Sequence, residues 1–265
     1  MKRPLFSLVY EDENIAAFDK CSGIAVRGDR WDPSQERLDK LAAEFLHVEK
    51  LYTVHRIDRE TSGLVVFAKN SETHRELSAA FEGRKVRKRY IAIVHGRPSW
   101  GETVCDLSLV PNGNKLHHTI VDKYRGKKSF TAFRFLGCAG NYSLLEALPE
   151  TGRTHQIRVH LAALGHPVVC DVLYGSAKPV QLSAIKHGWR GDPQEERPLL
   201  SRLGLHAEGL FIPGYSAEGF AGGENEAGEN EAAGLVLKAP LPRDMAALVH
   251  QMEKASGQII EGLLK

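Results

Sequence analysis

The chain has 265 residues, of which 42% are hydrophobic and 26% are charged, proportions that are typical of a globular protein with a sizeable core. No apolar run approaches the roughly 20 residues that cross a bilayer, and the N-terminus lacks the pattern of a signal peptide. The net charge of +2 is too small to indicate a nucleic-acid partner by itself. We therefore expect a cytoplasmic protein with no membrane partner, and a monomer by default.

The four cysteines do not have the spacing of a metal site. They are widely separated, at Cys21, Cys105, Cys138 and Cys170, and each lies among apolar or small neighbours. In a chain without an export signal, such cysteines are expected to be reduced core residues rather than disulfides.

The N-terminal third predicts strands followed by helices. Residues 5–10 and 15–18 are strand-like on either side of an acidic turn. Apolar residues at 38, 41, 42, 45 and 46 have the spacing of an amphipathic helix. A second helix is expected to begin at Ser71 or Thr73 and to end at Gly83.

Residues 55–69, HRIDRETSGLVVFAK, combine a polar loop with an apolar run. The run at 64–68 predicts a strand that is covered on both faces. In the loop, Asp58 is flanked by Arg56 and Arg59, and nearby positive charge is expected to keep a carboxylate ionised. Such an Asp suits a nucleophile or general base. The alternative is a surface salt-bridge cluster at the strand entry.

Residues 84–89 are the most basic stretch of the chain and precede a predicted strand at 90–94. They are either a solvated loop or a patch that contacts phosphates. A weaker basic group follows at Lys123, Arg125, Lys127 and Lys128.

Short strands outnumber helices in the middle of the chain. Residues 103–110, 130–135 and 142–148 are strand-like, and helices do not alternate regularly with them. This pattern favours an α+β fold over a doubly wound parallel sheet.

Residues 151–165 predict a helix that begins near Thr154 and ends at Gly165. His155 and Arg158 share one face of this helix, so both can point into one cleft. With Arg153, the start of the helix is also a possible anion site. A metal site is disfavoured because no carboxylate or cysteine completes a ligand set, and a surface helix with incidental basic residues is the competing interpretation.

The C-terminal third begins with a long polar connection at 176–202. Strands are expected at 204–212 and 234–238, and a capped helix at 242–252. Between the two strands, GENEA occurs twice in tandem at 223–232, so residues 214–234 are interpreted as an acidic low-complexity loop insert.

Five segments together resemble the RluA-type pseudouridine synthases, enzymes that isomerise uridine in structural RNA. HRIDRETSGLVVFAK is similar to the catalytic motif of that family, KRYIAIVHG to the second motif and TGRTHQIRVH to the third. GLHAEGLFIPG and LVLKAPLP resemble its closing hairpin. The likeness extends from about residue 10 to about residue 252. It implies one catalytic domain over residues 1–265, with a mixed, mostly antiparallel sheet in two lobes flanked by helices and a central basic cleft.

The resemblance also implies roles for individual residues. Asp58 falls on the essential aspartate, Tyr90 on a tyrosine that stacks against the target base, and Arg158 on an arginine that pairs with the aspartate. Arg56 matches a residue that replaces the flipped nucleotide in the RNA stack. The residues that we expect to contact RNA are Arg56, Arg84, Lys85, Arg87, Lys88, Arg89, Arg153, Thr154, His155 and Gln156. The partner would be tRNA or rRNA, and no cofactor or metal is expected.

The chain also departs from the family pattern. The GENEA insert enlarges the last hairpin, and we expect a stand-alone catalytic domain without the small N-terminal RNA-binding module of many relatives. One rival hypothesis is a catalytically inactive RNA-binding or ribosome-assembly factor on the same fold. A hydrolase is a second rival, but the chain has no G-x-S-x-G elbow around Ser62.

Overall fold

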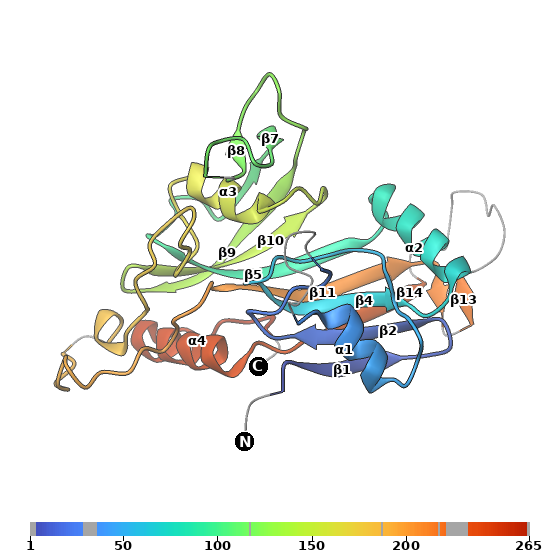
Figure 1. The fold of residues 1–265 in the computed structure, drawn as a ribbon. Coiled ribbons are helices and arrows are strands. Elements are labelled where there is room, and N and C mark those ends of the chain that lie inside the picture. Colours follow the sequence, from blue (N-terminus) through green and yellow to red (C-terminus); the bar gives the residue numbers. More distant parts are fainter. Residues whose placement is uncertain are drawn as a thin grey trace. The chain divides into compact units, whose positions relative to one another are not determined.

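The computed structural model describes residues 4–28, 36–116, 118–186, 188–216, 218–220 and 233–263. The chain divides into two compact units, each built from two segments. The first unit comprises residues 1–88 and 207–239, and the second comprises 89–206 and 240–265. The chain enters the second unit inside β5 (Arg87–His95) and returns to the first inside β11 (Leu205–Pro213) (Figure 1).

The first unit is a sheet with one helix on each face. Strands β1, β2, β4 and β11 are neighbours in that order, while β14 pairs with β11 and β3 with β4. The β1–β2, β2–β4 and β11–β14 pairs are antiparallel. The elements are β1 (Phe6–Glu11), β2 (Ile15–Lys20), α1 (Leu38–Phe45), β3 (Tyr52–Thr53), β4 (Ser62–Ala68), α2 (Ser71–Glu82), β12 (Tyr215–Ser216), β13 (Gly219–Phe220) and β14 (Gly234–Lys238).

Strand β4 is buried along its whole length, as its apolar run predicts. On one face, the Phe67 ring lies 6.2 Å from the ring of Phe18, which in turn contacts Phe45 of α1. On the other face, Val66 belongs to an apolar cluster that includes Leu77 of α2. Because successive strand residues point to opposite faces, β4 needs both helices to bury its side chains.

The predicted helices are present, but their starts differ from the prediction. The N-cap of α2 is Asn70, one residue before the predicted Ser71, and its side-chain oxygen accepts the Thr73 N–H at 2.9 Å. Asparagine is as good a cap as serine, so the local sequence did not distinguish the two. The C-cap is Gly83, as predicted.

The second unit is an antiparallel sheet in the order β5-β10-β9-β6. Helix α3 packs on one face through Ile157 and Leu161, and α4 packs on the other through residues such as Met245 and Leu248. The elements are β6 (Glu102–Cys105), β7 (Leu109–Val110), β8 (Ile120–Val121), β9 (Thr131–Ala139), β10 (Tyr142–Pro149), α3 (Gln156–Ala163), η1 (Leu182–Ala184) and α4 (Arg243–Ser256).

Two predictions in the second unit need correction. The predicted strand at 103–110 is divided into β6 and β7, and β7 pairs with β8 instead of continuing the main sheet. Helix α3 begins at Gln156, two residues after the predicted start, because His155 has a left-handed backbone with φ of 54°. The long connection at 176–202 is confirmed, since its described residues contain only the short helix η1.

The GENEA repeats at 223–232 lie outside the described residues, so the predicted loop insert is not tested. The described residues just before the repeats contain the small hairpin β12–β13. A hydrogen bond connects this hairpin to the turn between β1 and β2. The Tyr215 hydroxyl donates to the Asp12 carboxylate at 2.9 Å. Asp12 lies in the β1–β2 turn and also accepts a hydrogen bond from Tyr10 at 2.9 Å.

Gly63 lies close to the backbone of the neighbouring strand β11. Its φ is +115°, and a Cβ atom at this position would lie 2.2 Å from the carbonyl oxygen of Ala207 in β11. The backbone angle disfavours any L side chain, and the approach leaves no room for one.

We expect Gly63→Ala to destabilise the protein by about 3 kcal/mol or more, because backbone strain and overpacking add. Chemical denaturation measures this change. Gly101→Ala is the control, since its added Cβ meets no heavy atom within 4 Å. Similar unfolding midpoints for the two variants would contradict the constraint at Gly63.

His55 connects the motif loop to both β4 and α2. Its Nε2 accepts the Val66 N–H at 3.0 Å, and its ring stacks on Phe81 with centroids 4.6 Å apart. An Nε2 that accepts a hydrogen bond belongs to the neutral imidazole. Burial, with a smaller contribution from the positive charge of Lys88, lowers the pKa of His55 to about 3.

This pKa makes His55 a source of acid sensitivity. The unfolded chain binds more protons than the folded chain between pH 6.5 and 3, so stability from His55 is complete above pH 6.5 and is lost as the pH falls towards 3. We expect His55→Phe to lose about 1–3 kcal/mol at pH 7, because the Val66 N–H loses its acceptor. The variant should lose less than the wild type between pH 7 and pH 4.5.

Urea unfolding at the two pH values measures the difference. The pKa values of His95 and His160 are also lowered by burial, but both residues titrate in the wild type and in the variant. The comparison therefore isolates His55. An identical pH dependence in the two proteins would refute its role.

Candidate functional site

The loop that carries Asp58 is attached to the end of β2 by a buried lysine. Lys20 is 0% exposed, and its Nζ donates to the carbonyl oxygens of Cys21 at 3.0 Å, Ile24 at 2.9 Å and Arg59 at 3.0 Å. Hydrogen bonds to an ionised donor are stronger than neutral ones, which is why a cation is tolerated inside the fold. The residue after Asp58 is therefore fixed in space by a charge.

Three further contacts connect the same two segments. The Gly23 N–H donates to the Arg59 carbonyl oxygen at 2.8 Å, and the Ser22 hydroxyl donates to the Glu60 carbonyl oxygen at 2.6 Å. In return, Arg59 Nε donates to the Gly23 carbonyl oxygen at 2.9 Å. Arg59 is expected from its position in the sequence to flank the Asp58 carboxylate, whereas its guanidinium lies at this turn.

Asp58 itself is half-buried in the loop between β3 and β4. Its carbonyl oxygen accepts the Thr61 N–H at 3.1 Å, which closes a turn directly before β4. Arg56 is exposed two residues earlier. The loop thus holds the aspartate at the end of a rigid strand and presents an arginine to solvent.

The basic stretch at 84–89 is not a uniform solvated patch. Arg84 and Lys85 are exposed in the turn after α2, whereas Val86 between the cations is buried in the core of the first unit. The Arg87 guanidinium stacks 4.3 Å from the ring centre of Phe211. Burial, and secondly the charge of Arg84, lower the pKa of Lys88 to about 8.

In the second unit, Arg89 and Tyr90 point to opposite faces of β5. Arg89 Nε pairs with Glu146 at 2.5 Å, and its Nη2 donates to the Gly262 carbonyl oxygen at 3.1 Å. Tyr90 packs against the apolar cluster that contains Ile157 of α3. Of these two predicted site residues, only Tyr90 shares a face of the sheet with α3.

Arg158 lies on α3 in a buried ion pair with Asp171. The arginine side chain is 1% exposed and the aspartate 0%. Nε donates to Oδ2 and Nη2 to Oδ1, each at 2.7 Å. This two-point geometry fixes the plane of the guanidinium as well as its position.

The turn before α3 is built around Gln156, which is buried. Its Oε1 accepts from the Thr151 hydroxyl at 2.8 Å and from the Arg153 N–H at 2.9 Å. Its Nε2 donates to the Phe130 carbonyl oxygen at 3.0 Å and to Thr131 Oγ1 at 2.9 Å. These four bonds use the full capacity of the amide, so its position favours a structural role over RNA contact.

The neighbours of Gln156 in the predicted RNA-binding set are more accessible. Thr154 is exposed, and Arg153 is half-buried with its Nε 3.4 Å from the Lys128 carbonyl oxygen. His155 is half-buried, and its Nδ1 lies 2.8 Å from the Tyr174 hydroxyl. His155 and Arg158 contact the same residue, since the Arg158 guanidinium lies 5.2 Å from the ring centre of Tyr174.

The structure divides the predicted catalytic residues between the units and adds residues that the sequence analysis missed. Asp58 belongs to the first unit, whereas Tyr90 and Arg158 belong to the second. Lys20, Asp171 and Tyr174 were not singled out. An isolated lysine in an apolar strand is a signal for Lys20, but the partners of Arg158 are 13 or more residues away and carry no local pattern.

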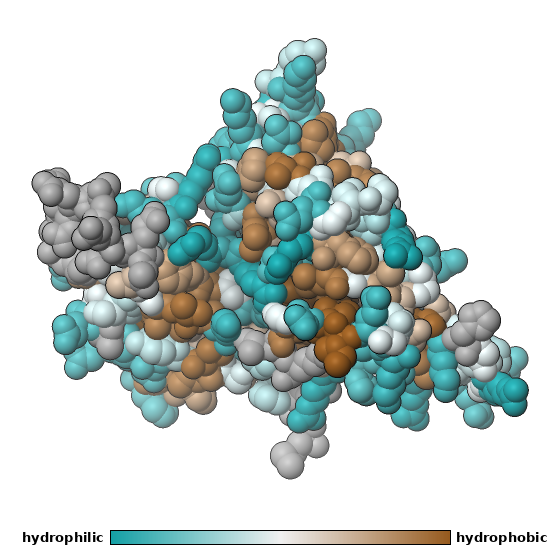
Figure 2. All heavy atoms as spheres, turned by 180° about the vertical axis from the view of Figure 1, so that it is seen from behind, coloured by the Kyte–Doolittle hydropathy of each residue, from teal (hydrophilic) through white to brown (hydrophobic). Residues whose placement is uncertain are grey.

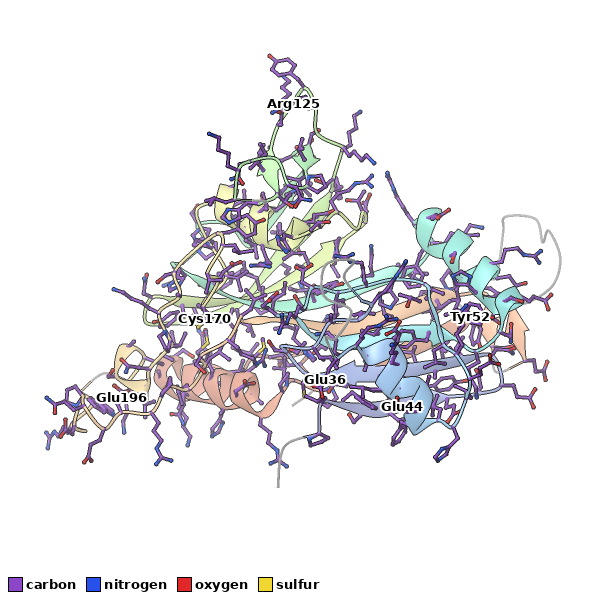
Figure 3. All side chains as sticks on the ribbon, in the orientation of Figure 1. Glu36, Glu44, Tyr52, Arg125, Cys170 and Glu196 are labelled. Atoms are coloured by element: carbon purple, nitrogen blue, oxygen red, sulfur yellow. The ribbon has the colours of Figure 1, made fainter. Side chains whose placement is uncertain are left out.

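The second basic group follows β8, in the loop that connects β8 to β9 (residues 122–130, the β8–β9 loop), where Arg125 marks the outer end (Figure 3). Asp122 shapes this tip, because its Oδ1 accepts the N–H groups of Tyr124 and Arg125 at 2.9 Å and its Oδ2 accepts from Arg125 Nε at 2.7 Å. Tyr124 is 93% exposed. The β8–β9 loop thus presents an aromatic ring among cationic side chains.

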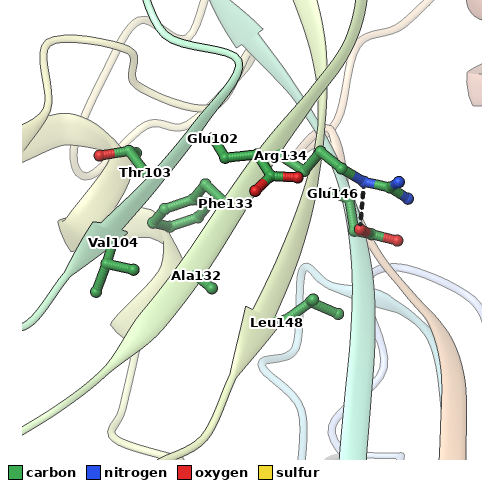
Figure 4. A pocket seen from close by; sticks show the side chains of 8 residues that line it. All are labelled: Glu102, Thr103, Val104, Ala132, Phe133, Arg134, Glu146 and Leu148. Atoms are coloured by element: carbon green, nitrogen blue, oxygen red, sulfur yellow. Dashed lines mark hydrogen bonds and ion pairs between the residues drawn. The ribbon is translucent and has the colours of Figure 1, made fainter.

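A groove on the sheet of the second unit contains none of the predicted catalytic or RNA-binding residues. Arg134 Nε pairs with Glu146 there at 2.9 Å (Figure 4). Its lining residues are Glu102, Thr103, Val104, Ala132, Phe133, Arg134, Glu146 and Leu148. Viewed from behind, the molecule shows several apolar patches with polar residues between them (Figure 2), which is ordinary for a water-exposed surface.

The structure also bears on metal binding and on membrane insertion. Within the described ranges, His, Cys, Asp and Glu side chains do not gather in threes at a possible metal site. None of the helices in the described part of the chain is both long and apolar enough to span a bilayer.

Comparisons with known proteins identify the family of this chain. The sequence model described as RNA pseudouridylate synthase matches residues 14–163, which is more than half of the chain. The Escherichia coli protein named dual-specificity RNA pseudouridine synthase RluA is 32% identical over 213 residues, covering 80% of this chain and 88% of that protein. Ribosomal large subunit pseudouridine synthase D of Zymomonas mobilis is 36% identical over 184 residues, covering 64% of this chain.

The chain spans 56% of the Zymomonas protein and 54% of its namesake from Borreliella burgdorferi, so it accounts for about half the length of these relatives.

Solved structures agree on the fold. Human RNA pseudouridylate synthase domain containing 4 has a TM-score of 0.67 at 22% identity, with 92% of each chain covered. Human RNA pseudouridylate synthase domain containing 1 has a TM-score of 0.64 at 25% identity, with 89% of this chain and 84% of that chain covered. The family match and the likeness to the E. coli relative, which covers 80% of this chain, lead to one conclusion. The chain belongs to the RNA pseudouridylate synthase family, in its RluA-type branch.

Proposed function

We propose that the protein isomerises uridine to pseudouridine at specific positions of tRNA or rRNA. The observation that carries this proposal is that the family match at 14–163 includes Asp58, Tyr90 and Arg158. The E. coli relative, which this chain covers almost fully, is itself named for dual-specificity RNA pseudouridine synthesis.

The reaction is an isomerisation that the residues of the chain can support. The bond between ribose C1′ and uracil N1 breaks, the uracil turns, and a bond forms between C1′ and C5. The hydrogen on C5 is released and N1 gains a proton, so the atoms of the nucleotide balance without an oxidant or a second substrate. Asp58 is the proposed nucleophile, and its attack is on the ribose or on the base.

Access to the uridine requires it to leave the RNA stack, which costs a few kcal/mol. Exposed Arg56 is suited to fill the vacated place, and Tyr90 offers an aromatic face to the base. Arg158 provides the positive charge for the aspartate, as the family resemblance implies. Exposed Arg84 and Lys85 are suited to phosphate contact.

The β8–β9 loop supports RNA as the partner. Tyr124 is the most exposed of the large apolar side chains in the described residues, and it stands beside Lys123 and Arg125. An exposed aromatic ring among cations is the arrangement that binds unpaired nucleotides by stacking and by phosphate contact.

The activity is tested by pseudouridine mapping of total RNA from cells with the wild-type protein, with Asp58→Asn or with the gene deleted. We expect positions that are modified only with the wild type. Glu60→Gln is the matched control, because it removes a carboxylate from the same loop and should retain every position. If the RNA of all strains is identical while the purified protein still binds RNA, the protein is instead an inactive RNA-binding factor.

RNA affinity tests the β8–β9 loop separately. We expect Tyr124→Ala to weaken RNA binding by about 1–3 kcal/mol through lost stacking. Replacing Lys123, Lys127 and Lys128 with alanine should reduce the slope of log affinity against log salt concentration by about 2 to 3, because fewer counterions are released. Lys254→Ala on α4 is the control for the loss of one surface charge. Unchanged affinity and slope in the variants of the β8–β9 loop would exclude this surface as an RNA contact.

A further inference from the structure

The guanidinium of Arg158 is enclosed on one edge and on one face by residues outside the three family motifs. Asp171 binds the Nε–Nη2 edge with two hydrogen bonds of 2.7 Å. The ring of Tyr174 covers a face, with its centre 5.2 Å from Cζ. Both partners lie after the helix that carries Arg158, in the segment Asp171 to Tyr174.

Asp171 is held in a charged state by its surroundings. Burial alone raises the pKa of a carboxyl group, but the hydrogen bonds and charge of Arg158, with two backbone N–H groups, outweigh burial and lower the pKa of Asp171. Those N–H groups belong to Leu173 and Tyr174, which donate to Oδ1 at 3.0 Å and 3.2 Å. The aspartate is therefore fixed by the backbone of its own turn before it fixes the arginine.

Tyr174 joins Arg158 to two other elements through its hydroxyl. The Thr119 N–H donates to the hydroxyl oxygen at 2.9 Å, and the same hydroxyl lies within hydrogen-bond distance of His155 Nδ1, 2.8 Å away. One side chain thus contacts the face of Arg158, the ring of His155 and the backbone of Thr119 next to β8.

The backbone conformation of His155 independently indicates that the contacts around Tyr174 and Arg158 are constrained. It has a φ of 54° at the N-cap of α3, a conformation that costs a residue other than glycine free energy and persists only when the surroundings enforce it. The contact with Tyr174 is such an enforcing interaction. Strained residues of this kind concentrate at functional sites.

We propose that Asp171 and Tyr174 are positioning residues that set the place and the plane of the Arg158 guanidinium for pseudouridine formation. This inference rests on the proposed function of the site. Asp171 binds the Nε–Nη2 edge, so it fixes the direction in which the rest of the guanidinium points. Asp171 also shares the charge of Arg158, which weakens the hold of the arginine on any other anion. Both effects act on the chemical step and not on RNA binding.

The test measures chemistry and binding separately. The substrate is total RNA from the deletion strain, labelled with tritium at uracil C5, because formation of the C1′–C5 bond releases that hydrogen. We expect Asp171→Asn to lower the single-turnover rate at least tenfold and to change the Kd for the same RNA less than threefold. Asp192→Asn, a carboxylate in the 176–202 connection, is the control and should match the wild type.

A double-mutant cycle shows whether Asp171 acts through Arg158. In the background of Arg158→Lys, which cannot form the two-point pair, we expect Asp171→Asn to have less than a threefold further effect on the rate. Multiplicative losses in the double variant, or a rate for Asp171→Asn within threefold of the wild type, would overturn the proposal.

Tyr174 provides a second series that decides the question if Asp171→Asn does not fold. Tyr174→Phe retains the ring under Arg158, whereas Tyr174→Leu removes it. We expect the rate to fall in the order wild type, Phe, Leu with the RNA Kd within threefold throughout, and equal rates would overturn the proposal. If the wild-type enzyme releases no tritium from any RNA, the proposed function itself is wrong. If the wild type is active and the variants are as active as the wild type, only the positioning role of Asp171 and Tyr174 is wrong.

Discussion

The ammonium group of Lys20 is the interaction on which the geometry of the first unit depends. A cation without exposure to water is stable only when strong acceptors surround it, and here those acceptors are backbone carbonyl oxygens. One of these acceptors is the carbonyl oxygen of Arg59, the residue after Asp58. The hydrogen bonds that stabilise the buried ammonium group of Lys20 therefore also hold the loop of the family's catalytic motif. A lysine that is costly to bury therefore gives the loop a defined position.

The second unit uses the same principle with a different partner. The buried charge of Arg158 is satisfied by the carboxylate of Asp171, and the bidentate contact defines an orientation that a point charge would not. In both units, a defined geometry near the motif residues is obtained because a buried ion is held by a small number of hydrogen-bond partners. Removing either partner of such a group leaves a buried charge without compensation, which is costly.

The sequence predicted what depends on local periodicity and missed what depends on distance. The fully buried strand β4, the helix that ends at Gly83 and the α+β class follow from short patterns, and the structure confirms each. The family motifs also identify the three proposed catalytic residues. By contrast, the pairing of Arg89 with Glu146 joins strands 57 residues apart, so the basic stretch could only be interpreted as one cluster. The N-cap of α2 was misplaced by one residue because two good capping residues, Asn70 and Ser71, stand side by side.

The division of each unit between two chain segments has a consequence for how the protein forms. Strand β4 has β11 as a neighbour, and the two lie about half the chain apart, with the second unit encoded between them. During synthesis, the edge of β4 that pairs with β11 therefore stays uncovered until most of the second unit has been made. Pairings of such long sequence separation are slow to form because the loop must close before the contact is gained. The N-terminal segment is thus expected to depend on the rest of the chain to acquire its final structure, and exposed strand edges at that stage are where misassembly would begin.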